Sequence, residues 1–122
     1  MIKGKLIHNI PLIQTTLVSG SAVRRPFVIL DTGFTGDLLV SNKVAKELGL
    51  KPIGVESVNI AGEKAVDMQS AIALANMEGI TKSVQVLISQ GGSLVGISFF
   101  KKFGYKAIVD CKNKLVTLER VA

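Results

Sequence analysis

The stretch that decides the fold is VILDTGFTGDLLV, residues 28–40. Four apolar residues ending at Leu30 lead directly into Asp31, and a second apolar run begins at Leu38. A strand that is apolar at consecutive positions predicts burial on both of its faces. Because an unpaired buried carboxylate is energetically costly, Asp31 must either find hydrogen-bond donors or keep its proton.

The sequence supplies donors immediately after the acid. Thr32 carries a hydroxyl, and Gly33 and Gly36 permit a tight loop whose amides turn toward the carboxylate. A bare Asp-Thr-Gly is more often a surface turn of the Asx type, so the tripeptide alone decides nothing. Its context favours a site, because a second apolar stretch ending in glycine, SLVGISFFKKFG at residues 93–104, follows later in the chain.

Composition restricts the class of protein. The 122 residues suffice for one compact domain, which we expect to span residues 1–122. An apolar fraction of 48% against 20% charged residues predicts a packed globular protein and not a disordered one. No run approaches the roughly 20 apolar residues of a membrane span, and the first ten residues do not resemble a signal peptide. We therefore expect a soluble, cytoplasmic protein with no membrane partner.

The supply of cysteine and histidine limits the possible chemistry. Cys111 is the only cysteine, which excludes an intrachain disulfide, a zinc cluster and a Cys-x-x-Cys pair. His8 is the only histidine and lies far from Cys111 in sequence, so nothing local suggests a catalytic Cys-His pair. We expect no metal and no cofactor.

The net charge of +6 raises the question of nucleic-acid binding. The basic clusters are only the pairs at residues 24–25 and 101–102, the other lysines are scattered, and the few aromatics lie in apolar runs and not along a basic stripe. This pattern favours solvated basic surfaces over a nucleic-acid partner.

Short β-branched runs between turn formers predict a mostly β chain. Even-numbered apolar residues from Val66 to Leu74 share one strand face. Paired strands are expected over residues 11–18 and 24–30, and a further strand over residues 2–7. Four hairpin turns are expected, at SGSA (19–22), AGEK (61–64), NMEG (76–79) and CKNK (111–114).

Two short helices are expected to interrupt the strands. In SNKVAKELGLKP, residues 41–52, Ser41 is positioned to cap the first turn and Gly49 lies where a C-terminal cap belongs. In ISFFKKFGY, residues 97–105, Ser98 is the expected N-cap and Gly104 the expected end.

These segments together resemble a single-domain aspartic protease of the retropepsin-like clan, close to its small prokaryotic members. ILDTGFTGDLLV matches the family's catalytic loop, LVGISFF its second apolar-apolar-Gly segment and helix, and AIVDCKNKLVTL its closing hairpin. The similarity spans roughly residues 10–119. It implies a closed, mostly β acid-protease barrel with one or two short helices.

The resemblance also implies a function, a homodimeric aspartic endopeptidase acting on a peptide or protein substrate. Each subunit would contribute one Asp31. Two carboxylates about 3 Å apart repel by several kcal/mol, so they share one proton and act as base and acid. The alternative is a module that keeps the fold for dimerisation or peptide binding without catalysis.

Further residues acquire roles by the same resemblance. Thr32 would hydrogen-bond across the two-fold axis, Gly33 would let the substrate backbone approach, and Phe34 would line a substrate pocket. The hairpin tip at residues 60–64 falls where the family carries its flap, so Ala61 and Gly62 would contact substrate.

Two departures from the family pattern concern the second glycine segment and the chain ends. Many relatives have Asp or Asn two residues after the glycine, whereas Gly96 is followed by Ile97 and Ser98. The chain ends also differ from those that form the dimer sheet in retroviral members. The sequence therefore leaves the dimer surface open.

Overall fold

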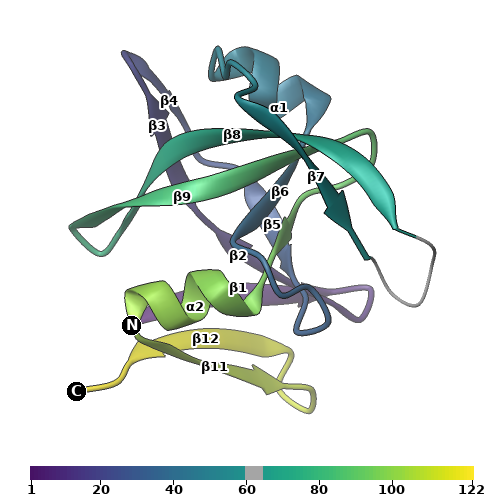
Figure 1. The fold of residues 1–122 in the computed structure, drawn as a ribbon. Helices are drawn as coiled ribbons and strands as arrows, with labels where there is room; N and C mark the ends of the chain where they lie inside the picture. Colours follow the sequence, from purple (N-terminus) through teal and green to yellow (C-terminus); the bar gives the residue numbers. More distant parts are fainter. Residues whose placement is uncertain (60–64) are drawn as a thin grey trace.

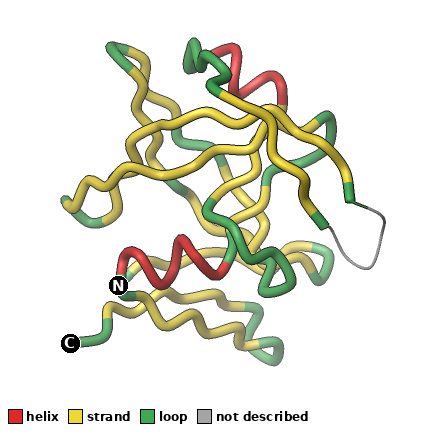
Figure 2. Tube along the Cα trace, viewed as in Figure 1, coloured by secondary structure: helices red, strands yellow, loops and turns green. Residues whose placement is uncertain are grey.

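The computed structural model describes residues 1–59 and 65–122, and β-strands dominate this part of the chain (Figures 1 and 2). The mostly β class expected from the sequence is confirmed. Two short helices accompany the strands, α1 (Asn42–Glu47) and α2 (Ile97–Phe103). The strands are β1 (Ile2–Ile7), β2 (Ile10–Gln14), β3 (Thr16–Ser19), β4 (Ala22–Arg24), β5 (Phe27–Leu30), β6 (Leu38–Ser41), β7 (Gly54–Val58), β8 (Val66–Met77), β9 (Ile80–Ser89), β10 (Leu94–Val95), β11 (Tyr105–Asp110) and β12 (Leu115–Arg120).

The strands form one mixed sheet that is strongly bent. Hydrogen-bonded neighbours follow the order β11-β12-β1-β2-β5-β10-β6-β9-β8-β3-β4, and β7 pairs with β8. β11 and β4 stand at the two ends of this order, and no pairing joins them within residues 1–59 and 65–122. The expectation of a closed barrel is therefore wrong for the described sheet, which is open.

The bend arises where the first long hairpin breaks. The predicted strands over residues 11–18 and 24–30 each divide in two, with Thr15 and Pro26 at the breaks. The Thr15 amide still donates to the Pro26 carbonyl at 3.1 Å, but Pro26 has no N–H with which to complete the ladder. The turn at residues 19–22 is confirmed, and the hairpin continues as β2–β5 on one side of the break and β3–β4 on the other.

The remaining hairpins pair as the sequence predicted. β7–β8, β8–β9 and β11–β12 are antiparallel. At the β8–β9 turn, Glu78 and Gly79 have positive φ angles of 52° and 83°, which suits a tight hairpin turn. The expected β7–β8 tip at residues 60–64 lies outside the described residues.

The core lies between the β8–β9 hairpin and the strands β1, β2 and β12, and α2 fills it (Figure 1). Phe99, Phe100 and Phe103 of α2 are all buried. Ala73 and Ala75 of β8 belong to the same buried cluster as these three rings. The neighbouring even-numbered residues Ile72 and Leu74 are exposed, so in this part of β8 the apolar face predicted from even-numbered residues points outward.

Both helices begin and end for identifiable reasons. The Ser41 hydroxyl accepts the Val44 amide at 3.3 Å, which confirms Ser41 as the N-cap of α1. Gly104 ends α2 in the left-handed conformation, as predicted. The expected cap at Ser98 is wrong, because Gly96 is the N-cap and Ser98 lies inside the first turn. Neither helix of the described ranges has the length and apolar composition of a membrane span.

Candidate active site

Three neighbouring strands hold the loop of residues 31–37. The two-residue strand β10 runs parallel to β5 and antiparallel to β6, so it joins the strands on either side of the loop. The Asp31 amide donates to the Val95 carbonyl of β10 at 3.0 Å. Asp31 therefore starts the loop from a fixed position at the end of β5.

β5 is not buried on both faces, contrary to the expectation from its sequence. Val28 and Leu30 are buried, whereas Phe27 is 46% exposed and Ile29 is half-buried. The reason is that only one face of β5 packs on the core, and the Lys5 ammonium lies 5.1 Å from the Phe27 ring on the other. Asp31, which follows Leu30, is itself partly exposed.

The carboxylate of Asp31 is bound by its own loop. The Gly33 amide donates to Asp31 Oδ1 at 2.9 Å, and the Phe34 amide donates to the Asp31 carbonyl at 3.2 Å. The expected amide donor is confirmed at Gly33. The contact has the geometry of an Asx turn, so the turn and the candidate site are the same structure. The side chain of Thr32 is exposed and makes no hydrogen bond within the described part of the chain.

A second acid of the same loop, Asp37, was not among the site residues predicted from the sequence. Its side chain is 5% exposed, and Oδ2 accepts the Lys102 ammonium at 2.7 Å and the Gln85 amide at 2.9 Å. Burial acts to raise the pKa of Asp37, but Lys102, the Gln85 amide and the nearby Ser98 hydroxyl together hold that pKa below its usual value. The available signal was an acid inside an apolar run, the same signal that identified Asp31.

The loop and the start of α2 are in close backbone contact. The Gly96 amide donates to the Asp37 carbonyl and the Ile97 amide donates to the Phe34 carbonyl, both at 3.0 Å. A Cβ at Gly96 would lie 2.3 Å from the Gly36 carbonyl oxygen and 2.5 Å from that of Phe34. Only glycine permits this approach, so the second apolar-apolar-Gly segment supports the loop that carries Asp31.

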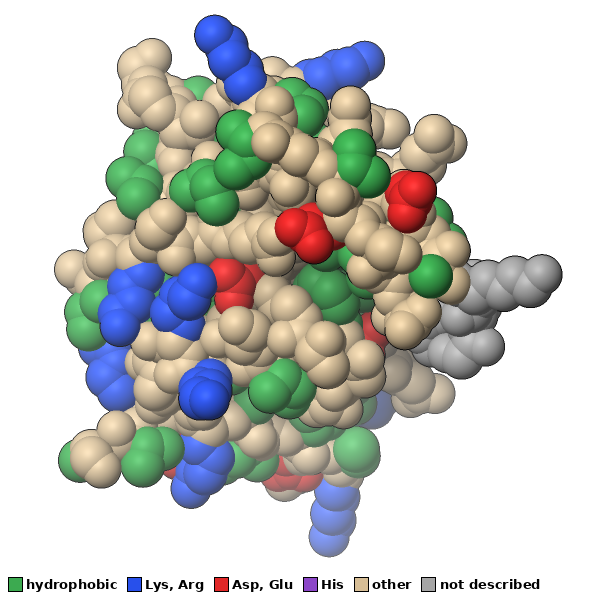
Figure 3. Space-filling view, in the orientation of Figure 1, with side chains coloured by type: hydrophobic (Ala, Val, Ile, Leu, Met, Phe, Trp, Pro, Cys, Tyr) green, Lys and Arg blue, Asp and Glu red, His purple; other side chains and the backbone are tan. Residues whose placement is uncertain are grey.

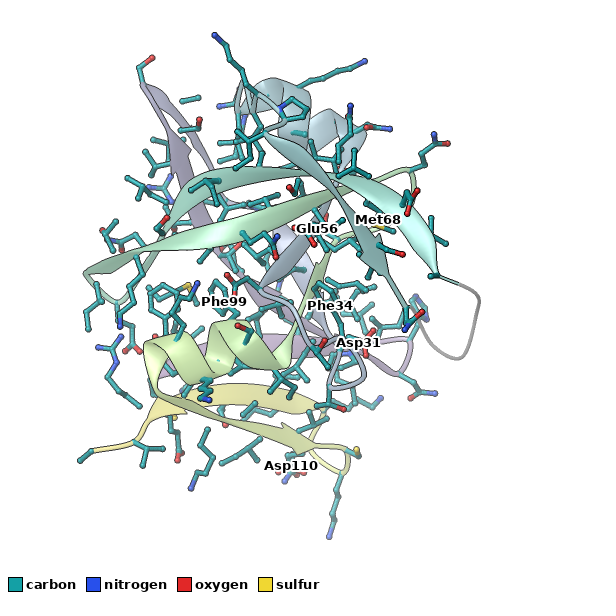
Figure 4. The ribbon with its side chains drawn as sticks, viewed as in Figure 1. Asp31, Phe34, Glu56, Met68, Phe99 and Asp110 are labelled. Atoms are coloured by element: carbon teal, nitrogen blue, oxygen red, sulfur yellow. The ribbon has the colours of Figure 1, made fainter. Side chains whose placement is uncertain are left out.

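Phe34, the predicted substrate-pocket residue, is 5% exposed. Its ring forms a small cluster with Leu39 and Leu87, and Met68 of β8 packs against this cluster. Figure 4 shows Phe34 between Asp31 and the β7–β8 arm. The side chain therefore lies beneath the loop and does not project freely from the surface.

Two cavities adjoin this region. One of about 520 Å³ lies between residues 66–69 of β8 and residues 88–91, with Asn42 at its edge. The other, of about 340 Å³, lies beside Thr32 and is lined by Ile97 and Phe100. In Figure 3 this face of the molecule is hollowed, with hydrophobic side chains at the floor and acidic side chains around it. The predicted substrate contacts Ala61 and Gly62 lie outside the described residues.

The structure brings His8 and Cys111 closer than their sequence positions suggested. Both line a pocket of about 210 Å³ where the β1–β2 and β11–β12 turns meet, but no hydrogen bond connects them. The correction comes from the pairing of β1 with β12, which places the two turns together. Within the described ranges, no group of three His, Cys, Asp or Glu side chains is arranged to hold a metal ion.

The bent sheet, the aspartate loop and the glycine-supported helix define the retropepsin-like fold of aspartic proteases. EIAV protease complexed with the inhibitor HBY-793 matches with a TM-score of 0.64 and 14% identity, over 84% of this chain and 95% of that one. A retropepsin-like aspartic protease from Rickettsia conorii matches with a TM-score of 0.65 and 17% identity, over 98% of this chain and 89% of that one. No family model and no curated protein matches the sequence. The predicted resemblance is thus confirmed at the level of the fold.

Proposed function

We propose that this chain is one subunit of a homodimeric aspartic endopeptidase, with Asp31 as the catalytic carboxylate of each subunit. The observation that carries the proposal is the placement of Asp31. It is partly exposed at the end of β5, and its carboxylate is held by the Gly33 amide 2.9 Å away. The retropepsin-like fold of the two solved proteases supports the same reaction class.

The mechanism follows from two carboxylates sharing one proton across the dimer axis. The ionised Asp31 takes a proton from a water molecule, whose oxygen attacks the carbonyl carbon of the peptide bond. The protonated Asp31 donates to the carbonyl oxygen as that oxygen gains charge. The Asp31 that took the water proton then passes it to the amide nitrogen, while the other Asp31 takes a proton back from a hydroxyl of the tetrahedral intermediate. The C–N bond breaks, a carboxylic acid and an amine leave, and the pair again holds one proton. No metal or cofactor takes part.

The surface beside the loop supports association of two copies. Thr32 is exposed, and Ile97, 44% exposed, lines the same groove of about 340 Å³. In the proposed dimer, Thr32 hydrogen-bonds across the axis and the apolar groove receives the partner's loop. Gly33, Ala61 and Gly62 would contact the peptide, and Phe34 would shape the floor beneath it.

The test compares the wild type with Asp31→Asn on a diverse peptide library, read by mass spectrometry across about pH 4 to 7. Asp110→Asn is the matched control, because it makes the same chemical change in the β11–β12 hairpin, away from the loop (Figure 4). Cleavage by the wild type and by Asp110→Asn that is lost in a folded Asp31→Asn dimer supports the proposal. Folded wild-type dimers that cleave nothing favour a non-catalytic dimerisation or peptide-binding module instead.

The dimer itself has a separate test. Because one subunit carries one Asp31, specific activity rises with protein concentration below the dimer dissociation constant. Analytical ultracentrifugation over the same concentrations locates that constant. Constant specific activity in a range where only monomer sediments would contradict the shared dyad.

A further inference from the structure

The ion pair of Asp37 and Lys102 joins three elements that are distant in sequence. Lys102 belongs to the last turn of α2, and its ammonium donates to Asp37 Oδ2 at 2.7 Å and to the Ser83 carbonyl of β9 at 3.1 Å. The Gln85 amide of β9 donates to the same Oδ2. The end of the Asp31 loop, α2 and β9 are therefore held at one point.

The two members of the pair differ in access to water. The side chain of Lys102 is 35% exposed, whereas that of Asp37 is 5% exposed. The other oxygen of Asp37, Oδ1, is buried and has no hydrogen-bond partner among the described residues. If the pair is broken, water can solvate the ammonium, but the buried carboxylate keeps only the Gln85 amide and the nearby Ser98 hydroxyl. The loss therefore acts on Asp37 and on the loop that carries it.

A short chain of backbone hydrogen bonds connects Asp37 to Asp31. The Asp37 carbonyl accepts the Gly96 amide, and the next amide, that of Ile97, donates to Phe34. The Phe34 amide in turn donates to the Asp31 carbonyl. Every step is a backbone hydrogen bond at the start of α2 or within the loop, and the far end of α2 is the end that Lys102 fixes.

We propose that the Asp37–Lys102 pair is a positioning device for the reaction, holding the loop so that Asp31 has the geometry that the shared dyad requires. The inference rests on the proposed function. Asp37 and Lys102 do not touch substrate; they act through the loop and α2. Their effect therefore falls on the rate of the chemical step more than on substrate binding.

The experiment uses Lys102→Met, with Lys102→Arg as the conservative variant and Lys106→Met as the matched control. Lys106 also pairs with an acid, Glu119 at 3.5 Å, but both side chains are largely exposed. With a peptide that the wild type cleaves, Lys102→Met is expected to lower kcat about 10- to 100-fold with little change in KM, measured well below the melting temperature. Lys102→Arg should recover most of kcat, and Lys106→Met should leave it unchanged.

Amide hydrogen exchange supplies a readout that does not depend on cleavage. In Lys102→Met, the amides of Gly33, Phe34 and Ile97 are expected to exchange at least about 10-fold faster, while the amide of the buried Val116 in β12 is unaffected. A purely structural role would accelerate Val116 equally, through global unfolding. If Lys102→Met does not fold, the same measurements are made on Asp37→Asn. This variant keeps an oxygen that can accept the Gln85 amide.

The outcomes separate this inference from the proposed function. Unchanged kcat, or loop amides that exchange no faster than Val116 relative to wild type, overturns the positioning role. If the wild type cleaves no peptide but the loop amides respond selectively to Lys102→Met, the proposed enzyme fails while the coupling of the pair to the loop stands. If Lys106→Met lowers kcat as much as Lys102→Met, the effect is one of surface charge and the inference is wrong.

Discussion

The two ends of the loop between β5 and β6 each carry an aspartate, and the two aspartates differ in exposure and in the donors that bind their carboxylates. Asp31 is partly exposed, and the donor to its carboxylate is Gly33 of the same loop. Asp37 is buried, and the donors to its carboxylate come from β9 and α2. A carboxylate bound by distant elements supports structure, whereas one bound by its own turn remains available to a substrate or to a second subunit.

The backbone shows the same difference. Near Asp37, the loop is pressed against the start of α2, where Gly96 leaves no room for a side chain. Near Asp31, Thr32 and Gly33 are exposed. The loop is therefore anchored at its inner end and open at its outer end, and substitutions at the two ends should have different consequences.

The largest effect is expected from Gly96→Ala. The added Cβ would lie 2.3 Å from one carbonyl oxygen and 2.5 Å from another, so backbone must shift. We expect a loss of more than about 4 kcal/mol in the free energy of unfolding, or failure to fold. Gly92→Ala is the control, because a Cβ there meets nothing within 4 Å. Urea denaturation of both variants measures the difference, and equal stabilities would show that the inner end is not anchored.

Phe34→Ala is expected to have the next largest effect. The ring is 5% exposed and packs with Leu39 and Leu87, so its removal leaves a cavity beneath the loop. We expect a loss of about 3 kcal/mol by urea denaturation. The control is Phe27→Ala, whose ring is 46% exposed and should cost less than about 1 kcal/mol. A small loss at Phe34 would mean that the ring is not part of the core.

Asp37 makes stability depend on pH. Its pKa is held below the usual value in the folded protein, so its contribution is present above the unfolded pKa of about 3.9 and is lost as pH falls through the lower, folded pKa. Asp37→Asn should therefore lower the free energy of unfolding by about 2 kcal/mol at neutral pH. The gap from wild type should narrow below about pH 4. A gap in urea midpoints that stays constant down to strongly acid pH would contradict this assignment.

Local signals in the sequence predicted most of the elements, because strands and caps depend on neighbouring residues. Ser41 and Gly104 illustrate this, since each acts on the helix beside it. Whether the sheet closes into a barrel is not decided by neighbouring residues. It depends on Thr15 and Pro26, where one long hairpin divides into two, and on a buried cluster to which β8 and α2 both contribute.

The candidate site was predictable at Asp31 and not at Asp37, for a related reason. The donor to Asp31 is two residues away, within the motif itself. The cation beside Asp37 belongs to a residue 65 positions away in the sequence. Two adjacent lysines at residues 101–102 predict a solvated basic pair. In the structure Lys101 is exposed, whereas the Lys102 ammonium reaches Asp37. Sequence spacing did not reveal which of them has a buried partner.

The smallest change in stability is expected from Gly33→Ala at the outer end of the loop. A Cβ there approaches only Asp31 Oδ1, at 3.2 Å, and Gly33 does not have a positive φ angle, so the fold should lose less than about 0.5 kcal/mol. The same methyl group would displace the proposed catalytic carboxylate by tenths of an ångström and narrow the approach of the substrate backbone. We therefore expect about a 100-fold loss in kcat/KM with a nearly unchanged urea midpoint. A variant as active as wild type would remove Gly33 from the proposed site, and one that unfolds would show that the outer end is as constrained as the end at Asp37.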